Sequence, residues 1–204
     1  MIRLLTSHEE KLMTRPLYER VFDHDGKGFV DYYYEDRCRD NRILVDVETD
    51  VRGAEQVVSM IHLNPYTLYV NGEELPALYV FAVATDDKFR HQGRMARLLE
   101  EVDQICARED IPFLFLIPVD TAIYTPFGYQ VLCELQRDKS VPYEEIRKNY
   151  DVYCVRDADY LRRMEKEAAL AAMGEVQELP EHSVIMVKTS LDLTGRKPYF
   201  MEEV

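Results

Sequence analysis

Two apolar segments on either side of an amphipathic helix constrain the fold of this chain most strongly. Residues 77–84 (ALYVFAVA) and 111–119 (IPFLFLIPV) are rich in β-forming side chains, as in strands buried on both faces. Between them, apolar residues recur three or four positions apart, which indicates a helix with one buried face: Met95, Leu98, Leu99, Val102, Ile105 and Cys106. The order predicts a βαβ unit with two parallel neighbouring strands and a right-handed crossover.

This helix opens at a single glycine with basic and imidazole side chains around it. Residues 90–96 read RHQGRMA and follow the end of the first strand. The first turn of a helix has unpaired backbone N–H groups and a favourable dipole for an anion, phosphate above all. Gly93 would let a ligand approach these amides, and the alternative is a relaxed loop with solvated arginines. Neither GxGxxG nor GxxxxGK[ST] occurs, so a dinucleotide fold and a P-loop NTPase are not supported.

Two blocks resemble the GNAT N-acetyltransferases. Residues 90–96 resemble their [Q/R]-x-x-G-x-[G/A] pyrophosphate loop, although Met95 replaces the last glycine or alanine, as in the Eis-like (enhanced intracellular survival) branch. Residues 117–132 resemble the Eis-like segment in which a proline precedes a short helix and a Tyr-x-x-Phe-Gly-Tyr turn. The residues that match this segment are Pro118, Tyr124, Phe127, Gly128 and Tyr129. Residues 29–37 are similar to the second helix of that branch, so the resemblance covers roughly residues 1–137.

The resemblance implies an α/β fold of the α+β type, with a mixed, centrally splayed β-sheet flanked by helices on both faces. It implies acetyl transfer from acetyl-CoA to a primary amine by direct attack, without a metal. The acetyl-CoA-binding residues would be Val83, Ala84, Thr85, Arg90, His91, Gln92, Gly93, Arg94, Met95 and Ala96. Tyr124 would be the general acid that protonates the leaving thiolate, and its alternative is a tyrosine packed in a turn. The competing function is an acetyl-CoA-binding or interaction module without transferase activity.

The general base is not assigned by the sequence. Several carboxylates are candidates, and none stands out: Asp36, Asp46, Glu48 and Asp86. In the Eis-like branch the terminal carboxylate of a final domain has this role, so the carboxylate of Val204 is a further candidate. The tyrosines at positions 32–34 are expected to pack on the sheet, with contact to a substrate as the alternative.

The strongly acidic composition sets limits on partners. A net charge of −13 argues against nucleic acid, whose phosphates would be repelled, and is compatible with a cationic acceptor or simply with solubility. No apolar stretch is long enough for a bilayer, and we expect a cytosolic protein with no membrane partner. Four widely spaced cysteines, without CxxC or a cluster at zinc spacing, are expected to be reduced. Homo-oligomerisation stays open.

The rest of the sequence predicts further elements and a division at residue 150. Ser7 and Glu10 form a capping box, and Asn71-Gly72 is a strong hairpin signal. Residues 1–150 would form the acetyl-CoA-binding domain. Residues 151–204 would be a strand–helix–strand extension, with the helix over 157–173 and a strand over 183–189. This extension is either a truncated second lobe or a segment that packs on the first domain and supplies its last strand.

Overall fold

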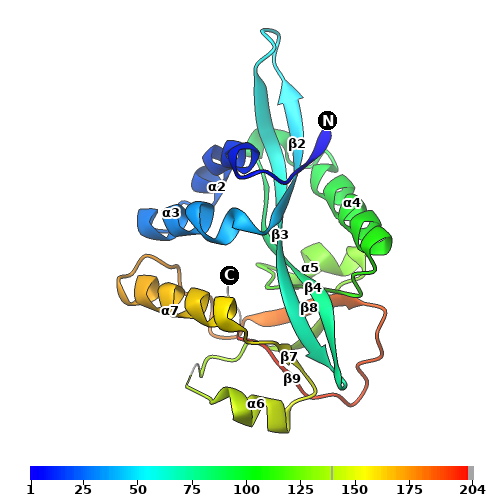
Figure 1. Cartoon of the computed structure of the whole chain (residues 1–204). Helices are drawn as coiled ribbons and strands as arrows, with labels where there is room; N and C mark the ends of the chain where they lie inside the picture. Colours follow the sequence, from blue (N-terminus) through cyan, green and yellow to red (C-terminus); the bar gives the residue numbers. More distant parts are fainter. Residues whose placement is uncertain (139, 202–204) are drawn as a thin grey trace. The chain divides into compact units, whose positions relative to one another are not determined.

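The computed structural model of the chain describes residues 1–138 and 140–201 (Figure 1). The chain forms two compact units. Unit 1 contains Met1–Asn64, Val80–Ile105 and Arg162–Glu178. Unit 2 contains Pro65–Tyr79, Cys106–Leu161 and Leu179–Val204. Each unit is thus assembled from segments that are far apart in the sequence.

Unit 1 is built on strands in the order β1-β2-β3-β4: β1 (Ile2–Leu5), β2 (Arg42–Thr49), the first part of β3 (Glu55–Val70) and the last part of β4 (Glu73–Thr85). β1 pairs antiparallel with β2, and β2 pairs antiparallel with β3. The register between β2 and β3 shifts between Asp46 and Val47, which marks a bulge. Side chains of β2 and β3 supply much of the core, including Ile43, Val45 and Ile61, which are fully buried.

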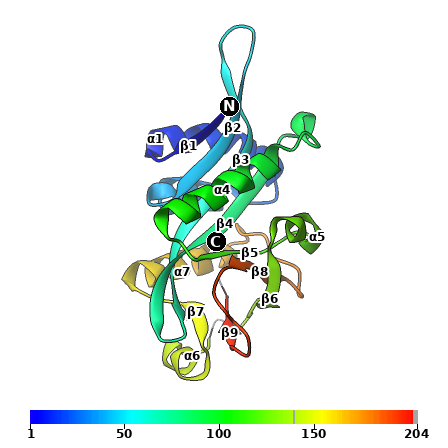
Figure 2. The same ribbon diagram turned by 90° about the vertical axis from the view of Figure 1, so that its right-hand side faces the viewer.

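Helices cover both faces of the strands in unit 1. Helices α2 (Arg15–Val21) and α3 (Lys27–Glu35) lie on one side of β2 and β3, and α4 (Arg94–Glu109) lies on the other (Figures 1 and 2). The shorter elements of this unit are α1 (His8–Lys11), η1 (Leu12–Thr14), η2 (Arg37–Arg39) and η3 (Asp87–Phe89). The predicted capping box at Ser7 and Glu10 is present. Tyr33 and Tyr34 are fully buried, as expected for tyrosines that pack on the sheet.

Unit 2 contains the parallel strand pair that the sequence predicts. Ala77–Tyr79 of β4 pair with Phe113–Phe115 of β5 (Phe113–Leu116) in parallel register, which confirms the predicted parallel strand pair. The right-handed crossover stays a prediction. Asn71 and Gly72 connect β3 to β4 with φ angles of 53° and 102°, the left-handed values that a two-residue type I′ hairpin turn requires. The other elements are α5 (Thr121–Tyr124), η4 (Thr125–Phe127), β6 (Gln130–Glu134), α6 (Tyr143–Asn149), β7 (Val152–Cys154) and β9 (Pro198–Tyr199).

The C-terminal extension contributes to both units. Helix α7 (Ala158–Ala172) begins at Asp157, whose Oδ1 accepts from the Tyr160 N–H at 2.7 Å, and Gly174 follows its end with φ 74°. Strand β8 (Val184–Thr189) lies between β5 and β6 and pairs antiparallel with both. The expected strand over 183–189 therefore forms and adds to the sheet of unit 2. The division of the chain at residue 150 stays a prediction.

Candidate functional site

The end of β4 in unit 1 has an unusual backbone. Ala82 has φ 47°, a left-handed value that costs a non-glycine residue about 1–3 kcal/mol. Such a residue inside a strand is typical of a bulge, which interrupts the hydrogen-bond ladder and leaves backbone groups for other partners. Beyond it, Ser59 Oγ donates to the Ala84 carbonyl oxygen at 3.0 Å and lies 2.8 Å from Thr85 Oγ1. The three predicted site residues Val83–Thr85 thus lie directly after a strained position and are held by β3.

A tight turn joins β4 to helix α4. Asp86 caps η3, and its Oδ1 accepts from the Lys88 N–H at 3.0 Å while its Oδ2 accepts from Arg20 at 2.6 Å. His91 and Gly93 then have φ angles of 60° and 71°. A side chain on Gly93 would meet no atom within 4 Å, so glycine is needed there for its backbone conformation and leaves the space above it open.

The first turn of α4 presents a run of unused donors. The first helical hydrogen bond runs from the Arg97 N–H to the Gly93 carbonyl oxygen at 3.1 Å. We find no acceptor, within residues 1–138 and 140–201, for the backbone N–H groups of residues 91–96. These N–H groups and the helix dipole together form a site that can bind an anion through backbone groups.

Two of the arginines at this turn are bound by carboxylates of β2, which argues against the alternative of solvated arginines. Arg94 donates to Asp46 Oδ2 at 2.8 Å and to Glu48 Oε1 at 2.5 Å, and its side chain is only 10% exposed. Arg97 donates to Asp46 Oδ2 at 3.0 Å. Burial alone would raise the pKa of Asp46, but hydrogen bonds from the N-terminal amine, Arg97 and Arg94 outweigh it and lower this pKa. The carboxylate is therefore ionised and holds both guanidinium groups.

The other arginine of the loop lies at the surface. Arg90 Nε donates to the Thr85 carbonyl oxygen at 3.1 Å, and its guanidinium is 2.7 Å from Asp87. His91 and Gln92 are exposed, and Met95 and Ala96 are half-buried at the start of α4. The structure therefore brings all ten predicted acetyl-CoA-binding residues into one continuous strand end, turn and helix start within unit 1.

Tyr124 lies in unit 2 at the end of α5. Tyr124 is only 8% exposed, and its ring packs edge-to-face on Tyr129, with ring centroids 5.9 Å apart. Burial raises the pKa of Tyr124 to about 12. Within the described part of the chain, no group forms a hydrogen bond with its hydroxyl. The phenol is therefore protonated at neutral pH, and its hydroxyl is available to donate a proton to a ligand.

The carboxylates considered as general bases are all engaged by arginines. Asp46 and Glu48 bind Arg94, and Asp86 binds Arg20. Asp36 accepts from Arg162 at 2.6 Å, and this hydrogen bond is the main cause that lowers its pKa to about 2. Arginine-bound carboxylates are poor proton acceptors at neutral pH. Val204 lies outside the described residues.

The sequence does not predict the hydrogen bonds between site residues that are far apart along the chain. No local pattern links Asp46 to Arg94 or Asp86 to Arg20, because these partners are 48 and 66 residues apart. The left-handed Ala82 also gave no signal, since nothing in ALYVFAVA distinguishes that alanine from its neighbours. Within the described ranges, no three histidine, cysteine or acidic side chains gather as metal ligands. In the same ranges, no helix combines the length and hydrophobicity of a membrane span.

A protein family and several solved structures match this chain. The acetyltransferase (GNAT) domain family matches residues 1–132. A GNAT family N-acetyltransferase from Escherichia coli, solved in complex with CoA, is 18% identical over 98% of this chain and 87% of that one, with a TM-score of 0.53. A GCN5-related N-acetyltransferase from Kribbella flavida is 13% identical over 93% of this chain and 72% of that one, with a TM-score of 0.54.

Other matching structures belong to longer proteins. A GCN5-related N-acetyltransferase from Anabaena variabilis is 18% identical over 66% of this chain, with a TM-score of 0.53. This chain spans 33% of that structure and 33% of a further match from Enterococcus faecalis. At such identities the structural likeness shows the fold alone, and no curated protein matches the chain. The predicted fold class, a mixed sheet flanked by helices, is confirmed, and the chain belongs to the GNAT acetyltransferase domain family.

Proposed function

We propose that this protein transfers an acetyl group from acetyl-CoA to a primary amine. The observation that carries the proposal is the run of N–H groups at residues 91–96, which have no acceptor within the described residues and lie at the positive end of α4. A pyrophosphate fits this position because its oxygens are acceptors only and its charge is opposite to that of the helix dipole. We assign the pyrophosphate of acetyl-CoA to residues 90–96.

The pantetheine arm and the thioester are assigned to the end of β4. Val83, Ala84 and Thr85 follow the left-handed Ala82, whose conformation is typical of a bulge in a strand. A free N–H near Val83 would donate to the thioester carbonyl oxygen and stabilise the oxyanion that forms there, a contribution typically worth about 3–4 kcal/mol. The order along the chain, strand end before helix start, matches the order of thioester, pantetheine and pyrophosphate along acetyl-CoA.

In the transfer step, the neutral amine attacks the thioester carbonyl carbon and the C–S bond breaks. The CoA thiolate then takes a proton, and we propose that Tyr124 supplies it, since its phenol is protonated and uncommitted. The attacking amine loses one proton to solvent, because the candidate carboxylates Asp36, Asp46, Glu48 and Asp86 are bound to arginines. The tyrosine recovers its proton from solvent after the thiol leaves.

Replacement of Tyr124 by phenylalanine tests this role, because it removes only the hydroxyl. Acetyl-CoA affinity should stay within about twofold, whereas kcat should fall by about two orders of magnitude, the usual contribution of a positioned general acid. Tyr129→Phe is the matched control, since this neighbouring ring lies in the same turn and is assigned to packing. Full turnover of the Tyr124 variant, or an equal loss in both variants, would show that Tyr124 is a packing residue.

The acceptor is proposed to be cationic, an aminoglycoside, a peptide lysine or a polyamine, and the branch to be Eis-like. The net charge of −13 supports a positively charged substrate, and the Tyr-x-x-Phe-Gly-Tyr turn supports the branch. We also propose a reducing, cytosolic location. In its favour, none of the four cysteines, all of which lie in the described ranges, forms a disulfide.

The second candidate function is an acetyl-CoA-binding module without transfer. It is favoured by one observation, the engagement of each candidate carboxylate by an arginine. A calorimetric titration with acetyl-CoA, followed by a thiol-release assay with a panel of amines, separates the two. Binding with turnover supports the transferase, binding without turnover on any amine supports the module, and lack of binding contradicts both.

A further inference from the structure

Two acidic residues of β2 contact the proposed pyrophosphate loop. Their negative charge is unexpected there, because a phosphate site favours positive charge. Asp46 has a side chain that is only 4% exposed, and it receives hydrogen bonds from Arg94 and Arg97. Glu48, which is 44% exposed, receives the second hydrogen bond of Arg94. All four residues belong to unit 1. We propose, on the basis of the proposed acetyl-CoA site, that Asp46 is a positioning residue that holds this loop ready for the pyrophosphate.

The contacts of Arg94 explain how a carboxylate on β2 acts on the loop. Besides Asp46 and Glu48, its guanidinium donates to Gln92 Oε1 at 3.3 Å and lies over the Phe89 ring, 5.0 Å from the centroid. Arg97 adds a hydrogen bond from Nη1 to the Gln92 carbonyl oxygen at 3.3 Å. One cationic side chain therefore connects β2, η3 and the loop, and Asp46 fixes that side chain.

The loop needs such support because its backbone is not relaxed. His91, with φ 60°, is a non-glycine residue in the left-handed region, and Gly93 follows two positions later with φ 71°. The N–H groups of residues 91–96 can converge on one anion only in a fixed loop conformation. If Asp46 fixes that conformation before the ligand arrives, binding avoids the entropy cost of ordering the loop.

The direction in which acetyl-CoA affinity changes when Asp46 or Glu48 is replaced distinguishes positioning from simple electrostatics. A carboxylate near an anion site repels the ligand, so charge alone predicts that removing Asp46 or Glu48 frees the arginines and tightens acetyl-CoA binding. Positioning predicts the reverse, because the loop loses its anchor. The two explanations therefore predict opposite shifts in the dissociation constant.

The test is a calorimetric titration of acetyl-CoA into wild type and into three variants: Asp46→Asn, Glu48→Gln and Asp36→Asn. Asp36→Asn is the matched control, because Asp36 is also a largely buried carboxylate that binds an arginine, but its partners lie on α7. We expect about tenfold weaker binding for Asp46→Asn, the equivalent of one charge-assisted hydrogen bond, and a smaller weakening for Glu48→Gln. Asp36→Asn should bind as wild type does.

The kinetic readout is a rise in KM for acetyl-CoA with kcat unchanged at saturation, which a general loss of stability would not produce. Asp46 also binds the N-terminal amine, and its variant can fail to fold, so the half-exposed Glu48 decides in that case. Equal or tighter binding by Glu48→Gln overturns the positioning role while the proposed function stands. A wild-type protein that does not bind acetyl-CoA overturns the proposed function itself.

Discussion

Unit 1 contains two helices that begin at a glycine, and they differ in whether the N–H groups of their first turns have hydrogen-bond acceptors. At the start of α3, the Gly28 N–H donates to Glu175 Oε2 at 2.8 Å and the Gly26 N–H donates to the Glu175 carbonyl oxygen at 2.8 Å. At the start of α4, the corresponding N–H groups have no acceptor within the described residues. Two similar helix starts in one unit are thus capped in one case and open in the other.

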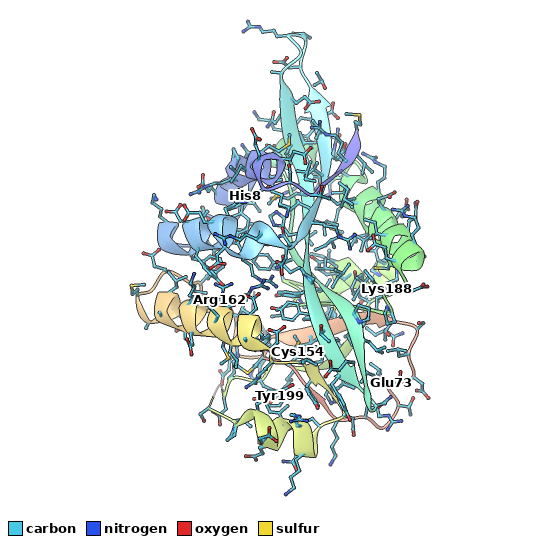
Figure 3. The ribbon with its side chains drawn as sticks, in the orientation of Figure 1. His8, Glu73, Cys154, Arg162, Lys188 and Tyr199 are labelled. Carbon is cyan, nitrogen blue, oxygen red and sulfur yellow. The ribbon has the colours of Figure 1, made fainter. Side chains whose placement is uncertain are left out.

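The space around the glycines shows the same difference. A Cβ on Gly26 would overlap Glu175 Oε2, whereas one on Gly93 would meet nothing within 4 Å. A hydrogen bond from Arg162 of α7, which Figure 3 labels, to Asp36 at the end of α3 is a further contact between these helices. A glycine at a helix start therefore does not by itself indicate a ligand site. The distinguishing feature is whether the chain supplies its own anion.

The largest effect is expected from Gly93→Val. A branched residue with φ near 71° is strained, and its side chain would occupy the open space that the pyrophosphate is proposed to fill. We expect acetyl-CoA affinity to fall by about 100-fold or more, since both the loop conformation and the access to the amides are lost. Calorimetry measures the affinity, and circular dichroism checks the fold. Unchanged affinity in a folded variant would refute the loop assignment.

Gly26→Ala should have the complementary effect on stability. The added Cβ would lie 2.8 Å from the Glu175 Cα, which is backbone, so the segment that follows α7 must move away from the start of α3. We expect a loss of about 1–3 kcal/mol in the free energy of unfolding, typical of overpacking, with acetyl-CoA affinity unchanged. Urea unfolding gives the first quantity and calorimetry the second. A variant as stable as wild type would mean that the contact with Glu175 is not maintained in solution.

Glu175→Gln should be milder, because the side chain keeps its size and one oxygen acceptor. The variant lacks the negative charge that interacts with the dipole of α3. Such an interaction stabilises a helix N-terminus by about 0.3–1 kcal/mol. Thermal unfolding at low and high salt measures the difference, which should shrink at high salt because screening weakens the wild-type interaction. A difference that does not depend on salt would argue against a dipole contribution.

The last prediction is a dependence of stability on acid pH, and it concerns Asp36 at the end of α3 and its partners on α7. The hydrogen bond from Arg162, with the help of Lys166, lowers the pKa of Asp36 to about 2 against the opposing effect of burial. Because the folded pKa lies below the unfolded value of about 3.9, this stabilisation is present above pH 4 and is lost as the pH falls toward 2. Asp36→Asn should therefore reduce the acid dependence of stability in that window. Parallel acid titrations of both proteins would show no difference if the carboxylate were unpaired in solution.

The sequence predicted those parts of the fold that depend on short-range patterns. The βαβ unit, the Asn71-Gly72 turn and the glycine-opened helix follow from periodicity and from local backbone preferences, and all three are present. The strand over 183–189 was recognised, but its place between β5 and β6 has no local signal. The contact of Glu175 with the start of α3 could not be predicted, because Glu175 and Gly28 are 147 residues apart in the sequence. Such contacts depend on how distant segments pack.

The same reasoning applies to the candidate site. Gly93 and its neighbours were found because an anion-binding helix start has a recognisable composition. The anchoring of Arg94 by Asp46 was missed, since arginines beside a glycine turn predict phosphate contacts just as well as internal ion pairs. Which of the two occurs is decided by a carboxylate on another strand, and its register is visible only in the folded chain.

Amide NMR can observe directly whether the open first turn of α4 binds the pyrophosphate of acetyl-CoA. Uniformly ¹⁵N-labelled protein titrated with acetyl-CoA should show saturable shifts of the N–H resonances of residues 91–96. The N–H resonances of Gly26 and Gly28, whose hydrogen bonds are occupied by Glu175, should stay in place and serve as the internal control. Saturable binding that leaves residues 91–96 unshifted would contradict the account.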